Sequence, residues 1–135
     1  MDCWCVCTDC SKGRLVDISA IEGEELSSVT FVQDYVQFDF NGPGLTLFIW
    51  PEVFVPAGAQ IGEGSYAHGE PGYRDALCLQ IGEPVETTSA EEGVALELKF
   101  ENGTIFRTSL REEDYEGPEA VQFSSGIAGD PLIVF

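Results

Sequence analysis

Basic residues are scarce in this 135-residue chain: six lysines and arginines stand against 24 aspartates and glutamates, for a formal net charge of −18. A field of that sign repels the phosphate backbone of nucleic acids and favours rapid encounter with basic proteins. Nucleic-acid binding is therefore excluded as an ordinary function, and the expected partner is a basic protein. The 11% of aromatic residues also separate the chain from disordered acidic segments.

Long hydrophobic runs are lacking as well. The most apolar stretch, LTLFIWPEVFV at 45–55, is interrupted by Pro51 and Glu52, whereas a membrane span needs about 20 apolar residues. Residues 1–10 contain no lysine or arginine, so they do not resemble a secretory signal. We expect a cytoplasmic protein without a membrane segment, built as a cysteine-rich arm at 1–14 and one β-rich domain at 15–135.

Catalytic motifs are missing too, since the chain contains no nucleophile elbow, no P-loop and no H-E-x-x-H. The only histidine, His68, lies in a glycine-rich loop at 58–72, close in sequence to Glu70 and Asp75. A carboxylate beside an imidazole is the usual general acid–base pair. A small enzyme or ligand-binding domain at this loop is thus one alternative, and it requires these three residues to line one pocket.

Cysteines are the first feature present in excess. Cys3, Cys5, Cys7 and Cys10 form C-x-C-x-C-x-x-C, and thiolates of this kind suit zinc or copper(I). The spacing lacks the two separated knuckles of structural zinc sites and is closer to metallothionein-style clustering. The segment is a thiol metal site, an arm without a site or, least favoured because the acidic flank lacks a basic second signal, an acylated anchor. No other cofactor is expected. The fifth cysteine, Cys78, is expected to be a small buried residue on a helix.

Alternation of apolar and polar residues indicates two β-hairpins. Residues 33–40 alternate, NGPG at 41–44 predicts a turn, and residues 45–50 are suited to the returning strand. The pattern recurs at 94–100, followed by an Asn-Gly turn at 102–103 and a further strand. A period of two predicts that six residues face the core: Val36, Phe38, Phe40, Leu96, Leu98 and Phe100.

The segments that precede the hairpins also match, since IEGEEL at 21–26 resembles IGEPV at 81–85. This indicates duplicated units at 21–55 and 81–123, although two acidic hairpins can also look alike by chance. Pro71 and Gly82 bracket one short helix, and PLIVF at 131–135 predicts a final strand. The predicted fold class is mainly β, with antiparallel sheets in a partly open barrel or sandwich and one short helix.

An acidic run near the end of the second unit is the expected partner-binding surface. It lacks the ligand order of a calcium-binding EF-hand loop, so a solvated acidic face that recognises a basic surface is favoured. Its carboxylates are Glu112, Glu113, Asp114, Glu116 and Glu119.

Three phrases, DYVQFDF, GYRDALC followed by IGE, and EDYEGPEA, resemble small acidic, β-rich bacterial proteins, some of which are similar to immunity proteins that neutralise partner toxins. The resemblance covers residues 21–123. It implies a non-enzymatic role in binding one protein partner and brings no catalytic residues. The cysteine-rich start has no counterpart in it.

Overall fold

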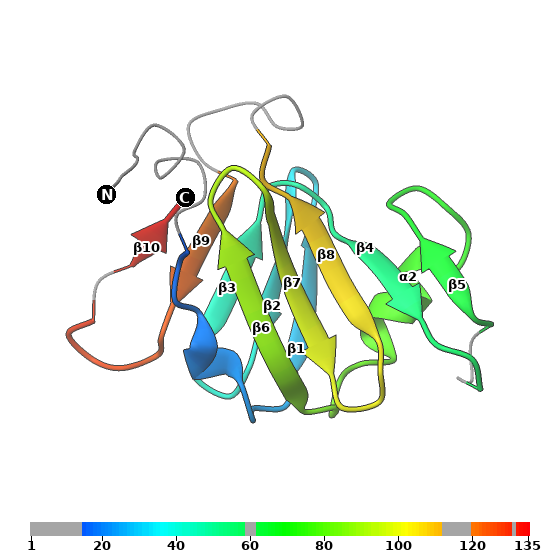
Figure 1. Ribbon diagram of the computed structural model, residues 1–135, viewed down its shortest axis with the longest axis horizontal. Coiled ribbons are helices and arrows are strands. Elements are labelled where there is room, and N and C mark those ends of the chain that lie inside the picture. The colour runs from blue at the N-terminus through cyan, green and yellow to red at the C-terminus, as the bar shows by residue number, and fades with distance from the viewer. Residues whose placement is uncertain (1–14, 59–61, 112–119, 131) are drawn as a thin grey trace, which may run out of the picture.

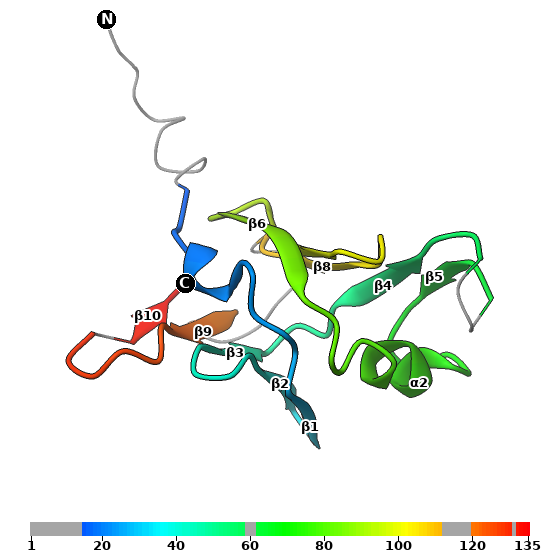
Figure 2. The same cartoon turned by 90° about the horizontal axis from the view of Figure 1, so that it is seen from below.

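The computed structural model describes residues 15–58, 62–111, 120–130 and 132–135, which form two antiparallel sheets packed as layers (Figures 1 and 2). The first sheet has the order β1 (Ser28–Val32), β2 (Tyr35–Asp39), β3 (Gly44–Leu47), β9 (Val121–Ser124), β10 (Ile133–Val134). The second has the order β5 (Gly64–Tyr66), β4 (Glu52–Val55), β8 (Ile105–Ser109), β7 (Ala95–Phe100), β6 (Val85–Glu91). The predicted mainly β class is confirmed, and the sheets are not closed into a barrel.

Helices are short in the described ranges. The α-helix α2 (Tyr73–Cys78) lies inside the predicted interval 71–82, and a 3-10 turn, η1 (Ser19–Ile21), precedes β1. The two occupy related places, because η1 packs on β6 while α2 packs on β1 and β4. The turn η1 leads into the first sheet but contacts the second. The helix α2 leads into the second sheet and contacts one strand of each sheet.

The two halves of the chain exchange strands. Strands β1, β2 and β3 are neighbours in the first sheet, and β6, β7 and β8 are neighbours in the second. The next two strands of each half cross over: β4 and β5 continue the second sheet beside β8, while β9 and β10 continue the first sheet beside β3. Units 21–55 and 81–123 contain β1–β4 and β6–β9, in equivalent positions. Each half therefore supplies three strands to one sheet and two to the other.

The two similar segments 21–26 and 81–85 lie against each other. They run antiparallel through an isolated bridge between Glu25 and Pro84. Four backbone hydrogen bonds join them: Gly23 N–H to Val85 O (2.8 Å), Val85 N–H to Glu24 O (3.0 Å), Gly82 N–H to Leu26 O (2.7 Å) and Leu26 N–H to Glu83 O (3.2 Å). Exchanging the two segments converts the first pair of bonds into the second. This crossing, defined by residues 21–26 and 81–85, is locally two-fold symmetric.

The core lies between the sheets and follows the predicted alternation. All six predicted residues are at most 1% exposed: Val36, Phe38, Phe40, Leu96, Leu98 and Phe100. The intervening Asp39 is exposed, as the register requires. Phe106 of β8 joins the layers, because its ring lies 5.3 Å from that of Phe38 in β2 and 4.8 Å from that of Phe100 in β7.

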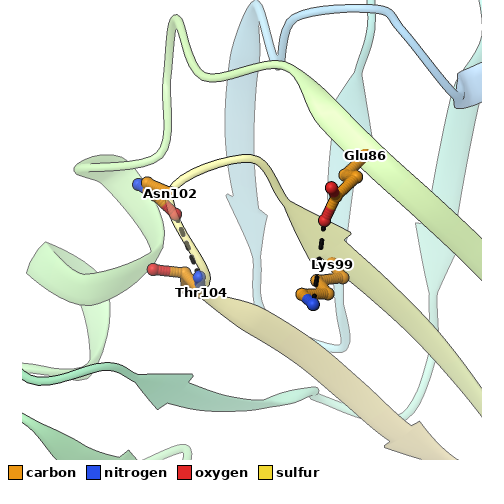
Figure 3. A network of polar contacts seen from close by, with 4 residues as sticks. All are labelled: Glu86, Lys99, Asn102 and Thr104. Carbon is orange, nitrogen blue, oxygen red and sulfur yellow. Dashed lines mark hydrogen bonds and ion pairs between the residues drawn. The ribbon is translucent and has the colours of Figure 1, made fainter.

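Both predicted hairpins are present, and the second turn is held by side-chain amides. Asn102 accepts a hydrogen bond from Thr104 N–H (2.9 Å) and donates one to the buried Gln80 (2.9 Å). Figure 3 shows the first of these bonds beside the ion pair between Lys99 and Glu86, whose charged atoms are 3.7 Å apart. The turn is thereby fastened to the chain that follows α2.

Three strand predictions are wrong in extent. Residues 33–34 form the turn between β1 and β2, so the predicted strand at 33–40 begins at Tyr35. The predicted strand at 45–50 ends at Leu47, and residues 48–51 carry the chain to the other sheet. Pro51 has no N–H to donate to a ladder, which favours a break before β4. In the final segment only Ile133–Val134 form a strand, and residue 131 lies outside the described residues.

Gly126 lies where the loop after β9 meets the turn between β2 and β3. A Cβ atom there would be 2.4 Å from the carbonyl carbon of Gly42, and the backbone φ is +79°. We expect Gly126→Ala to lower the free energy of unfolding by roughly 2–4 kcal/mol, through left-handed strain and displaced backbone. Urea denaturation measures the loss. Gly129→Ala is the control, because the φ of Gly129 is also positive, at +91°, but no atom lies within 4 Å of an added Cβ. Equal losses of stability in the two variants would contradict the expected clash at Gly126.

Candidate functional site

The three residues that the sequence singled out around the only histidine line one hollow. His68, Glu70 and Asp75 border an open cavity of about 280 Å³ beside the start of α2, together with Gly69, Gly72, Tyr73 and Arg74. The Glu70 carboxylate accepts a hydrogen bond from Ala67 N–H (2.8 Å), which closes a local turn. Within the described residues, His68 forms no hydrogen bond or ion pair with Glu70 or Asp75. The geometry is that of a binding hollow rather than an assembled acid–base pair.

A ring stack holds His68 in place. The imidazole lies parallel to the indole of Trp50, with centroids 4.1 Å apart and planes 9° apart, and meets Tyr73 edge-on at 5.8 Å. The Tyr73 hydroxyl donates a 2.5 Å hydrogen bond to the carbonyl of Pro51, and burial raises the pKa of Tyr73. Residues 48–51, which connect the two sheets, are thus fastened to α2. Sequence reasoning missed Trp50, although the proline after it indicates that the strand is interrupted there.

The other end of the stack carries a cation. Phe31 of β1 lies parallel to Trp50, with centroids 6.2 Å apart and planes 10° apart. The guanidinium carbon of Arg74 lies 5.8 Å from the centroid of the Phe31 ring, a cation–π contact. We call the series Arg74, Phe31, Trp50 and His68 the ring stack. It joins β1, residues 48–51 between β3 and β4, the loop at 58–72, and α2.

The expectation that Cys78 is buried is wrong, because this free thiol is exposed. The helix buries Tyr73, Ala76 and Leu77, and the buried Gln80 continues the same spacing of three and four residues. A helix of six residues has room for one such face, and Cys78 falls outside it.

Although Cys78 is exposed, the protein around it removes part of its hydration, and this desolvation together with the negative charge of Asp75 raises the pKa of the thiol. Because the thiolate is the nucleophile, we expect iodoacetamide to alkylate Cys78 at pH 7 about twofold or more slowly than free cysteine, with the rate rising at higher pH. Asp75→Asn should recover part of the rate, and Glu70→Gln should not. The measurement uses a background in which the other four cysteines are serine. A rate equal to that of free cysteine would contradict the prediction.

Carboxylates gather at the crossing. We call six of them the crossing cluster: Glu22, Glu24, Glu25, Glu83, Glu86 and Glu101. The turn at 101–103 joins it through a bond from Glu101 N–H to Pro84 O (3.0 Å), and these segments meet at the lower edge of Figure 1. Glu22 accepts two 2.9 Å hydrogen bonds from Thr88. None of the six is buried, and only Glu86 forms an ion pair with a described residue.

Two sets of predicted site residues lie outside the described residues. They are the proposed metal ligands Cys3, Cys5, Cys7 and Cys10, and the proposed partner-binding residues Glu112, Glu113, Asp114, Glu116 and Glu119. In the described ranges, no three histidine, cysteine or acidic side chains are grouped to hold a metal ion, and no helix has the length and apolar character of a membrane span. In comparisons with known proteins, no family model, no curated protein and no solved structure matched the chain.

Proposed function

We propose that this protein is a non-enzymatic intracellular protein-binding domain whose acidic surface occludes a basic partner protein, in the manner of immunity-type inhibitors. The observation that carries the proposal is the placement of charge. Seven of the 24 acids lie outside the described residues, and none of the remaining 17 is buried. Their summed field therefore reaches solvent, where it accelerates encounter with a basic surface.

Little of this charge is neutralised by the protein itself. The described ranges contain four basic residues, and two of these, Lys99 and Arg107, pair with Glu86 and Glu97. Arg74 is directed at Phe31. Exposed pairs of this kind contribute at most about 1 kcal/mol each, so a basic partner that displaced them would lose little.

The outer faces of the two sheets differ in charge, although their strands occupy equivalent positions. The second sheet presents a row of Glu52, Arg107, Glu97 and Ser89. The equivalent row of the first sheet is Gln122, Thr46, Gln37 and Thr30. Asp39 is the only carboxylate on that outer face among the described strand residues, and it accepts a hydrogen bond from Ser28. A basic partner is therefore expected on the second sheet and the crossing cluster.

The crossing cluster is suited to docking because its main chain is already ordered. Glu25, Glu83 and Glu101 are carried by segments joined through backbone hydrogen bonds. A surface that is ordered before binding loses less conformational entropy on association. The acidic run at 112–119 remains a predicted second contact surface.

The test is the salt dependence of association with a partner identified by affinity capture and then purified. Raising salt from about 0.05 M to 0.5 M shortens the screening length from roughly 14 Å to roughly 4 Å. We expect the on-rate, measured by stopped flow, to fall about tenfold or more while the off-rate changes less. The triple variant Glu25→Lys, Glu83→Lys, Glu101→Lys should reduce the on-rate similarly at low salt.

The matched control reverses three acids elsewhere: Asp34→Lys, Glu63→Lys and Asp130→Lys. It changes the net charge equally, so an equal fall in on-rate would assign steering to the whole field rather than to the crossing cluster. An on-rate indifferent to salt and to both triple variants would refute the proposed function.

A second candidate function, ligand binding at the loop 58–72, is favoured by the hollow beside His68. Because Glu70 is engaged by Ala67 N–H and His68 is stacked on Trp50, the geometry supports binding more than acid–base catalysis. Thiol metal binding at residues 3–10 is separable from both by metal analysis of the purified protein.

A further inference from the structure

We infer that the hollow beside His68 is a subsite for the guanidinium group of an arginine side chain on the basic partner. The inference rests on the proposed function, because that function supplies the basic partner. It adds a specific place and a preference for arginine over lysine, neither of which follows from the acidic charge alone.

The first support is the open end of the ring stack. Trp50 covers one face of the His68 imidazole, and His68 itself is exposed and borders the hollow. The planar guanidinium group stacks well on flat rings, whereas an ammonium group has no plane to stack. Because Trp50 and Tyr73 hold the imidazole, the ring is positioned before a ligand arrives.

The second support is the charge of the lining. The lining contains two acidic residues, Glu70 and Asp75, against one basic residue, Arg74, and Asp75 forms no ion pair with a described residue. Glu70 has one oxygen engaged by Ala67 N–H, which leaves the other as an acceptor. Guanidinium donates in a planar fork that matches a carboxylate, so one group can stack on His68 and pair with Asp75 together.

The third support is the contact that the protein already makes at the opposite end. Arg74 also borders the hollow, but its guanidinium carbon lies over Phe31 rather than over His68. One end of the ring stack is thus capped by an arginine of the chain itself. The His68 end offers an equivalent flat surface in a hollow that Glu70 and Asp75 also line, and a partner's arginine would complete the series.

The experiment uses the full chain with Trp4→Phe, so that Trp50 is its only tryptophan. It is titrated with the capped peptide Gly-Arg-Gly and with the same peptide carrying lysine or citrulline. We expect arginine to change Trp50 fluorescence and the backbone amide shifts of residues 66–76 in the millimolar range. Lysine should bind about threefold or more weakly, because it loses the stacking contact, and citrulline should not bind.

Variants separate the two contacts. His68→Ala and Asp75→Asn should each weaken the arginine peptide about three- to tenfold. His68→Phe should retain most of the affinity, because it keeps a flat ring. Glu63→Gln is the matched control, since it removes an exposed carboxylate that does not border the hollow. Its affinity should equal that of the starting protein.

Equal binding of arginine and lysine peptides, or amide shifts spread evenly over all acidic segments, would overturn the subsite. That result leaves the proposed function standing, because charge steering needs no arginine pocket. Conversely, specific arginine binding in a protein whose partner associates independently of salt would retain the subsite and refute the steering.

Discussion

Neither half of this protein is expected to fold when it is produced alone. Fragments 1–69 and 70–135 each contain five described strands, but two strands of each belong to the other fragment's sheet. In fragment 1–69, strand β4 lacks its pairing partner β8, and strand β3 lacks its pairing partner β9. Without these partners the inner faces of β2 and β3 stay exposed to water, and burial no longer offsets the conformational entropy of folding.

Thermal melting followed by circular dichroism measures whether each fragment folds. Each fragment alone should show no cooperative transition, and an equimolar mixture should recover one. The control is the intact chain cleaved at an engineered protease site between Gly69 and Glu70, which should stay associated because both residues are exposed. A cooperative melt of fragment 1–69 alone would show that the strand exchange is dispensable.

Truncation of Phe106 is expected to have the largest effect of any single substitution considered for this core. The side chain is 1% exposed, and its ring contacts Phe38 across the layers and Phe100 within its own sheet. Phe106→Ala removes both contacts and leaves a cavity that neighbouring rings fill only partly. We expect a loss of about 3–5 kcal/mol in the free energy of unfolding, measured by urea denaturation.

The matched control is Phe54→Ala on the adjacent strand. Phe54 is 36% exposed and points to the outer face, so its truncation should cost roughly 1 kcal/mol. If Phe106→Ala is too unstable to purify, Phe106→Leu should show a loss of about 1–2 kcal/mol, because the volume is largely retained. Equal losses for Phe106→Ala and Phe54→Ala would mean that the rings do not join the layers.

The two halves of the chain pair at the crossing, and part of the acidic surface lies there. The strands are exchanged between β3 and β4 and between β8 and β9, and the two halves also pair directly through segments 21–26 and 81–85. Because segment 21–26 carries three glutamates and segment 81–85 carries one, this pairing places like charges on one edge of the molecule. Such repulsion costs stability. In the proposed function that cost is offset by faster and tighter association with a basic partner.

The sequence by itself determined the elements whose cause is local. Period-two alternation places Phe38, Phe40, Leu98 and Phe100 in the core whatever the sheet order, because successive side chains point to opposite faces. The turn at 102–103 needs only its own Asn-Gly pair, and the helix needs only Pro71 before it, Gly82 after it and its apolar spacing. The association of His68, Glu70 and Asp75 was also within reach, because they are separated by only a few residues.

Tertiary structure decided everything that depends on distant residues. No local pattern predicts that β4 pairs with β8 of the other half rather than with β3 before it. The inner face of β4 is apolar and would suit either strand as a neighbour. The stacking of Trp50 on His68 joins residues 18 positions apart in the sequence, and it exists because the chain crosses between the sheets at that point. Cys78 is exposed for the same kind of reason: the face that α2 buries is set by the strands it packs on, β1 and β4, and not by the apolarity of its own residues.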